Sequence, residues 1–104
     1  MSILNERYII GPAAKLQEEA ILNSIKLKSV YPGVYFLTLA SNKLEQLEIV
    51  TSITYFSDDA KKHMQIVGIA YGKREAMYLV KVIADKVYRD KAAADIRGYF
   101  GGET

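Results

Sequence analysis

The chain has 104 residues, of which half are hydrophobic and a quarter are charged, and it contains no cysteine. A domain of this length hides roughly 60–70% of its unfolded surface, so a hydrophobic core can form without disulfides. The lack of cysteine excludes a disulfide framework, a thiolate nucleophile and a cysteine-ligated metal, and it favours a cytoplasmic location. No apolar run approaches the roughly 20 residues of a membrane span. We therefore expect one domain over residues 1–104, without a membrane partner.

The net charge of +2 is too small to indicate nucleic-acid binding by itself. Its distribution is uneven, because residues 61–104 hold nine cations against five anions, whereas residues 31–60 sum to −3. The chain also has eight tyrosines and no tryptophan. Tyrosine is favoured at contact surfaces, but it also suits the buried face of a sheet.

The first expected elements are a lead-in and a helix. Residues 1–11 form the lead-in, with a short strand at Arg7 to Ile10. A helix from Pro12 to Lys28 follows, because proline is favoured in the first helical turn and apolar residues recur along one side.

Three strands are expected next, at Val34 to Ala40, Leu47 to Phe56 and Met64 to Tyr71. The first is almost continuously apolar, which is typical of a strand buried on both faces. The second alternates between two half-apolar faces. Short links favour an antiparallel meander of the three strands.

The last expected helix begins at Lys73 and continues to Tyr88. Its apolar residues recur at helical spacing, at Ala76, Leu79, Val80, Ile83 and Val87. Asp95 to Phe100 is expected as a final short strand, and residues 101–104 as a frayed tail.

The predicted fold is α+β, in the order α-β-β-β-α(-β). It is a two-layer sandwich, in which two helices cover one face of a three-stranded antiparallel meander. The other face of the sheet is apolar enough that we expect a second copy of the chain to cover it. The predicted assembly is thus a homo-oligomer formed through this sheet face.

A candidate anion site lies where the third strand meets the last helix. Only three residues separate Gly68 from Gly72, and Arg74 stands where a phosphate loop has a hydroxyl residue, so a nucleotide hydrolase is excluded. Backbone donors near a strand-to-helix junction can still hold an anion. The candidate residues are Gly72, Lys73, Arg74, Lys61 and Lys62. The alternative interpretation is a glycine that permits a tight turn, followed by solvated cations.

No cofactor or metal is expected. His63 is the one histidine, and Asp59 lies four residues before it, but a single histidine without cysteine makes a poor transition-metal site. No serine has the Gly-x-Ser-x-Gly setting of a hydrolase nucleophile. Acid–base chemistry needs only one well-placed carboxylate or lysine, so an enzyme is not excluded, although no motif favours one.

Two resemblances involve this region. Gly72-Lys73-Arg74-Glu75-Ala76, together with the order helix–three strands–helix, resembles the double-stranded-RNA-binding domain, in which a cationic helix start grips phosphates. Met77 stands where that family has a further lysine, so nucleic-acid binding is the alternative and is not favoured.

Residues 35–100 are also similar to a group of short uncharacterised bacterial proteins. The matching pieces are Leu37-Thr38-Leu39-Ala40-Ser41, Leu47-Glu48-Ile49, Ile66-Val67-Gly68-Ile69-Ala70, Glu75-Ala76, Leu79-Val80 and Asp95-Ile96-Arg97. This resemblance implies a cytoplasmic bacterial protein of unknown function, and it supplies no catalytic residue.

Three hypotheses of function follow. The favoured one is a small non-enzymatic domain that acts through protein association, chiefly with itself. The second is a nucleic-acid or anion binder centred on Lys61, Lys62, Lys73 and Arg74. The third is an enzyme or small-molecule binder with a pocket between helix and sheet.

Overall fold

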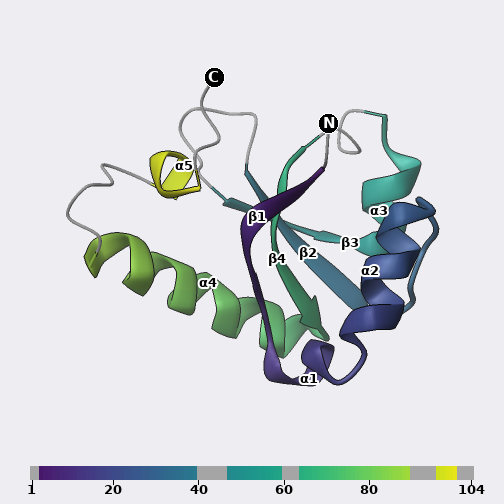
Figure 1. The fold of residues 1–104 in the computed structure, drawn as a ribbon, viewed down its shortest axis with the longest axis horizontal. Helices are drawn as coiled ribbons and strands as arrows, with labels where there is room; N and C mark the ends of the chain where they lie inside the picture. Colours follow the sequence, from purple (N-terminus) through teal and green to yellow (C-terminus); the bar gives the residue numbers. More distant parts are fainter. Residues whose placement is uncertain (1–2, 40–46, 60–63, 90–95, 101–104) are drawn as a thin grey trace.

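The computed structural model describes residues 3–39, 47–59, 64–89 and 96–100 (Figure 1). The strands are β1 (Leu4–Ile10), β2 (Val34–Leu39), β3 (Leu47–Thr51) and β4 (Ile66–Tyr71). The helices are α1 (Pro12–Lys15), α2 (Glu18–Lys26), α3 (Ser52–Ser57), α4 (Lys73–Arg89) and α5 (Ile96–Tyr99). The α+β class is confirmed, and so are the strands now labelled β2 and β4 and the long helix α4.

The sheet is mixed, and the predicted antiparallel meander is wrong. Over the described residues the strand order is β1-β4-β2-β3, with β1 parallel to β4 and with β2 antiparallel to both β4 and β3. β3 and β4 are therefore not neighbours, because β2 lies between them in the sheet. β4 takes a central place, and Ile66 to Ala70 are all buried. Burying the most apolar strand in the middle removes the most apolar surface from water.

Helices cover both faces of the sheet, so the predicted two-layer arrangement is also wrong. Figure 1 shows α4 on one side of the strands and α2 on the other. One core cluster joins α1, α2 and α3 to the sheet through residues that include Ala14, Ile21 and Tyr55. A second cluster joins α4 and the C-terminal segment to the opposite face. The sheet face that we expected a second copy to cover therefore carries a helix of the same chain.

The N-terminal part differs from the prediction in two ways. The lead-in is β1, a strand of the sheet that begins at Leu4, earlier than the expected start at Arg7. The expected single helix is divided into α1 and α2, because Gln17 leaves helical geometry with φ −125° and ψ 24°. The Tyr31 hydroxyl donates to Gln17 Oε1 at 2.6 Å, which fixes the break against the loop before β2.

The expected strand from Leu47 to Phe56 ends at Thr51, where α3 begins. The Thr51 hydroxyl oxygen accepts a hydrogen bond from the Thr54 backbone N–H at 3.1 Å, which is an N-cap. The helix turns Tyr55 into the core, where its ring packs edge-on against Phe36 at 5.3 Å between centroids. The predicted strand at Asp95 to Phe100 is wrong as well, since Ile96–Tyr99 form α5, while Asp95 lies outside the described residues.

Two phenols, the buried Tyr55 and the partly buried Tyr8, give the folded state a predictable loss of stability at high pH. Burial raises the pKa of Tyr55 from 10.0 to about 12. Burial, and then the hydrogen bond to Glu18, raise the pKa of Tyr8 to about 12. The unfolded phenols ionise near pH 10 while the folded ones stay protonated, so their stabilising contribution is complete below pH 10 and is lost as the pH rises to 12.

We expect the free energy of unfolding to fall between pH 10 and 12, and to fall less in the Tyr8→Phe/Tyr55→Phe double variant. Denaturant unfolding at pH 8, 10, 11 and 12 measures this. Tyr71→Phe, at an exposed position at the end of β4, is the control and keeps the wild-type slope. Identical slopes in the double variant and the wild type would contradict the assignment to these two phenols.

Candidate functional site

The junction between β4 and α4 is a tight turn at Gly72. Its φ of +94° lies in the left-handed region, which favours glycine. The Gly72 backbone N–H donates to the Gly33 carbonyl at 2.8 Å, and the Gly72 carbonyl accepts from Ala76 N–H at 3.1 Å. The tight-turn interpretation of Gly72 is therefore confirmed. Gly68 lies inside β4, opposite Leu37 of β2, and takes no part in a loop.

Glu75 supplies an anion to this junction from the chain itself. Its Oε2 accepts from Ala13 N–H at 2.7 Å, and its Oε1 accepts from Ala14 N–H at 3.0 Å and from Tyr71 N–H at 2.9 Å. The carboxylate also occupies the space that a side chain at Gly11 would need. One carboxylate thus satisfies backbone donors from both α1 and the end of β4.

The structure places three of the five predicted anion-site residues together. Gly72, Lys73 and Arg74 are consecutive, and the two cationic residues are exposed at the start of α4. Lys61 and Lys62 lie outside the described residues, as does His63. Glu75, which sequence reasoning missed, takes the Tyr71 donor next to Gly72. No local signal reveals its contacts with Ala13 and Ala14, which lie more than 60 positions earlier in the chain.

The outer side of α4 carries exposed apolar residues in a regular pattern. We call this surface the α4 outer face. Its exposed members are Met77, Tyr78, Lys81, Ala84, Asp85 and Tyr88. The exposed fractions are 51% for Met77, 54% for Tyr78 and 88% for Tyr88. The opposite side of the helix is buried against the sheet by Ala76, Leu79 and Ile83.

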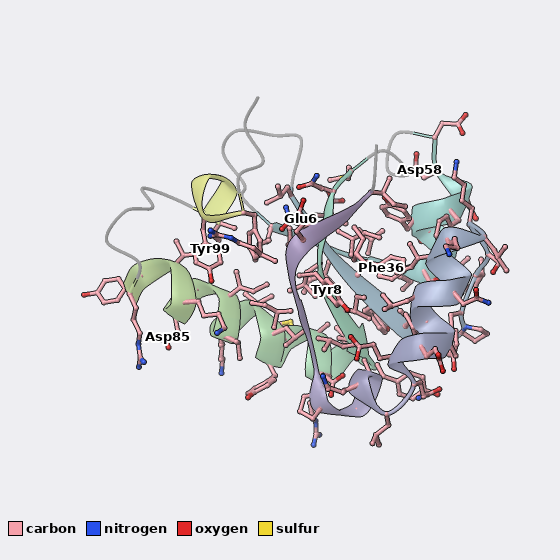
Figure 2. All side chains as sticks on the ribbon, in the orientation of Figure 1. Glu6, Tyr8, Phe36, Asp58, Asp85 and Tyr99 are labelled. Carbon is pink, nitrogen blue, oxygen red and sulfur yellow. The ribbon has the colours of Figure 1, made fainter. Side chains whose placement is uncertain are left out.

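A hollow lies beside this face, between α4 and α5. It has a volume of about 480 Å³, and we call it the α4–α5 hollow. Its lining residues are Val82, Asp85, Lys86, Arg89 and Tyr99. Figure 2 shows Tyr99 between α5 and α4, and Asp85 pointing away from the sheet. A second hollow, of about 540 Å³, lies on the outer side of α2. Neither hollow includes the predicted anion-site residues.

α5 is held in place by side chains of β1. Asn5 Nδ2 donates to the Phe100 carbonyl at 2.9 Å, and Arg7 Nη1 donates to the Tyr99 carbonyl at 2.8 Å. The Arg7 guanidinium also lies 5.3 Å from the centroid of the Tyr99 ring, a distance at which a cation–π contact is favourable. The wall of the α4–α5 hollow is therefore fixed to the sheet.

The part of the chain that the structure describes contains no group of three or more histidine or acidic side chains that could hold a metal ion. Within the same residues, no helix is both long enough and apolar enough to cross a bilayer.

Comparison of the chain with protein-family models, with curated proteins and with solved structures gave no match. The resemblance to the group of short bacterial proteins therefore stays a prediction. The order helix–three strands–helix, on which the resemblance to the double-stranded-RNA-binding domain partly depended, is not the order of this sheet.

Proposed function

We propose that the protein is a non-enzymatic association module that pairs with a second copy of itself through the α4 outer face. The observation that carries this proposal is the row Met77, Lys81, Ala84 and Tyr88 on the exposed side of α4. Their spacing of four, three and four residues is the spacing of the contact positions in a coiled coil. A lysine at one such position is a known means of fixing the register of paired helices.

The composition of this face supports a protein partner. Single exposed apolar residues are normal on a protein surface. Here two tyrosines and a methionine share one side of one helix, and these residue types are enriched at protein interfaces. The inner side of α4 already packs on the sheet, while Met77, Tyr78 and Tyr88 on its outer side stay exposed.

The two alternative hypotheses receive less support from the geometry. An anion bound at Gly72 would compete with the carboxylate of Glu75, which already holds the Tyr71 N–H, and would contact chiefly the Lys73 and Arg74 side chains. An enzyme would need polar groups that converge in a pocket. Among the described residues, the linings of the two hollows include no nucleophile–base pair.

Tyr88→Glu is expected to weaken self-association by about tenfold or more, because the loss of an aromatic hot spot from an interface costs about 2 kcal/mol or more. Leu16→Glu is the matched control: Leu16 is 87% exposed and Tyr88 is 88% exposed, but Leu16 lies outside α4. Both changes add one negative charge and replace an exposed apolar side chain. Light scattering over a concentration series gives the mass of each variant.

The expected result is a lower mass for Tyr88→Glu at concentrations where the wild type and Leu16→Glu are still paired. Equal weakening by both variants would indicate a general effect of charge and would contradict the α4 outer face as the interface. Thermal unfolding of both variants controls for folding, and we expect changes within about 0.5 kcal/mol for such surface sites.

A further inference from the structure

We propose that the two copies bind with their α4 helices antiparallel, and that Tyr78 of each copy enters the α4–α5 hollow of the other. This inference rests on the proposed self-association and specifies its geometry. The partner is a second copy of this chain, because the projecting side chain and the hollow that would receive it are on the same molecule.

Tyr78 and the α4–α5 hollow lie towards opposite ends of α4. Tyr78, Val82, Asp85 and Arg89 follow one another at intervals of four, three and four residues, so they form one row along α4. Tyr78 is the N-terminal end of this row, and the other three residues line the hollow at its C-terminal end. In an antiparallel pair, this row on one helix lies beside the same row on the other, and the N-terminal end of each helix lies beside the C-terminal end of its partner. This is the self-complementary arrangement of a two-fold interface.

The distance along α4 from Tyr78 to the hollow fits an antiparallel pair of helices. The helical residues that line the hollow centre between Asp85 and Lys86, which is about 11 Å along the helix from Tyr78 at a rise of 1.5 Å per residue. The two-fold axis would therefore pass near Val82. α4 comprises Lys73–Arg89, so an axis at this place lets the two helices overlap over almost their whole length.

The residues that line the hollow suit a tyrosine side chain. It is an open hollow with a volume of about 480 Å³, so an aromatic side chain can lie in it. Val82 and the Tyr99 ring offer apolar contact to the phenol ring, and Arg89 offers a cation for its face. The phenol hydroxyl can reach the charged rim, which suits the amphipathic character of tyrosine. Asn5 and Arg7 hold α5 in place, so the hollow exists before pairing.

The charged residues of the α4 outer face also bear on the direction of pairing. Lys81 and Asp85 are both exposed on α4 and lie on either side of the proposed axis. With the axis near Val82, antiparallel pairing places Lys81 of one copy about 3 Å in level from Asp85 of the other and about 3 Å from the other Lys81, while the two copies of Asp85 lie about 9 Å apart. Parallel pairing would instead place lysine level with lysine and aspartate level with aspartate, and like charges in contact disfavour an interface. Asp85 also pairs with Arg89 of its own helix at 3.2 Å, across an exposed surface where such a pair contributes little.

Cysteine cross-linking distinguishes antiparallel from parallel pairing of the α4 helices. The native chain has no cysteine, so each introduced cysteine is the only thiol in its variant. With the axis near Val82, Met77 of one copy lies within about 1.5 Å of Tyr88 of the other, measured along the helices. On the same measure, the two copies of Met77 lie about 15 Å apart, and the two copies of Tyr88 lie about 18 Å apart. The experiment mixes Met77→Cys protein with Tyr88→Cys protein and adds a bismaleimide that spans about 10 Å, the separation of packed helices. Each variant alone is treated in the same way.

The expected result is efficient cross-linking in the mixture and little in either variant alone. Cross-linking of each variant with itself, without enrichment in the mixture, overturns the antiparallel arrangement and leaves self-association standing. A dimeric mass without any cross-link also overturns it, since α4 would then lie away from the interface. A monomeric mass for the wild type overturns both this inference and the proposed function.

A fluorescence reporter tests the entry of Tyr78 into the hollow. The chain has no tryptophan, so Tyr78→Trp gives a single emission signal. We expect this emission to shift to shorter wavelength as protein concentration rises and the ring leaves water, whereas Leu16→Trp, at an exposed position outside α4, keeps its wavelength. An unchanged Tyr78→Trp emission over a range in which light scattering shows the mass to double would overturn the proposed contact.

Discussion

Glu75→Ala is expected to lower the free energy of unfolding by about 2–4 kcal/mol. The carboxylate of Glu75 accepts hydrogen bonds from the backbone N–H groups of Ala13, Ala14 and Tyr71. Hydrogen bonds to a charged acceptor are worth about 1.5–3 kcal/mol each, but water can replace part of this interaction at a half-buried site. A change of this size shifts Tm by roughly 10–20 °C in a domain of about 100 residues.

Two variants separate this effect from a general loss of charge. Glu75→Gln keeps the shape of the side chain but replaces one acceptor oxygen with an N–H donor, so it is expected to lose a large part of the same stability. Glu19→Ala removes an exposed carboxylate from α2 and should stay within about 0.5 kcal/mol of the wild type. Equal stability of Glu75→Ala and Glu19→Ala in denaturant unfolding would contradict the role given to Glu75.

Phe36→Ala is expected to have the largest effect on stability, a loss of about 3–5 kcal/mol, as is usual when a buried aromatic ring is removed. Phe36 is fully buried on β2 and packs edge-on against Tyr55 and Phe56, at 5.3 and 6.1 Å between ring centroids. Its removal would leave a cavity between the sheet and α3. Since domains of this kind are stable by only about 5–15 kcal/mol, the variant approaches the limit of folding at room temperature.

Leu16→Ala is the matched control for the loss of an apolar side chain, because Leu16 is 87% exposed. Urea unfolding of both variants, followed by circular dichroism, gives the two free energies. We expect the midpoint to fall sharply for Phe36→Ala and to stay near the wild-type value for Leu16→Ala. A loss below about 1 kcal/mol in Phe36→Ala would mean that α3 does not pack on the sheet as described.

The elements that could be predicted from the sequence are those with one dominant pattern. β2 and β4 are nearly continuous apolar runs, and α4 has buried residues at Ala76, Leu79 and Ile83 at helical spacing. The strand order could not be predicted, because pairing depends on where α3 redirects the chain between β3 and β4. The alternation of Leu47 to Phe56 continues past the point where the strand ends, and only the capping contact between Thr51 and Thr54 marks the change.

The candidate sites show the same division. Gly72, Lys73 and Arg74 could be located from the sequence because the strand-to-helix junction is a local feature. The carboxylate that fills this junction could not, since Glu75 reaches α1 across more than 60 residues. The α4 outer face had a visible signal, the second row of residues from Met77 to Tyr88. The sequence instead favours a sheet face for self-association, because it does not reveal that α2 and α4 cover opposite faces of the sheet.

Sedimentation equilibrium of the wild-type chain, from micromolar to millimolar concentration, tests self-association most directly. The monomer has a mass of 11.7 kDa. The expected result is a mass that rises with concentration to twice this value. For Tyr88→Glu we expect the rise at higher concentration, and for Leu16→Glu at the same concentration as for the wild type. A wild-type mass that stays at 11.7 kDa throughout this range would contradict the proposed function.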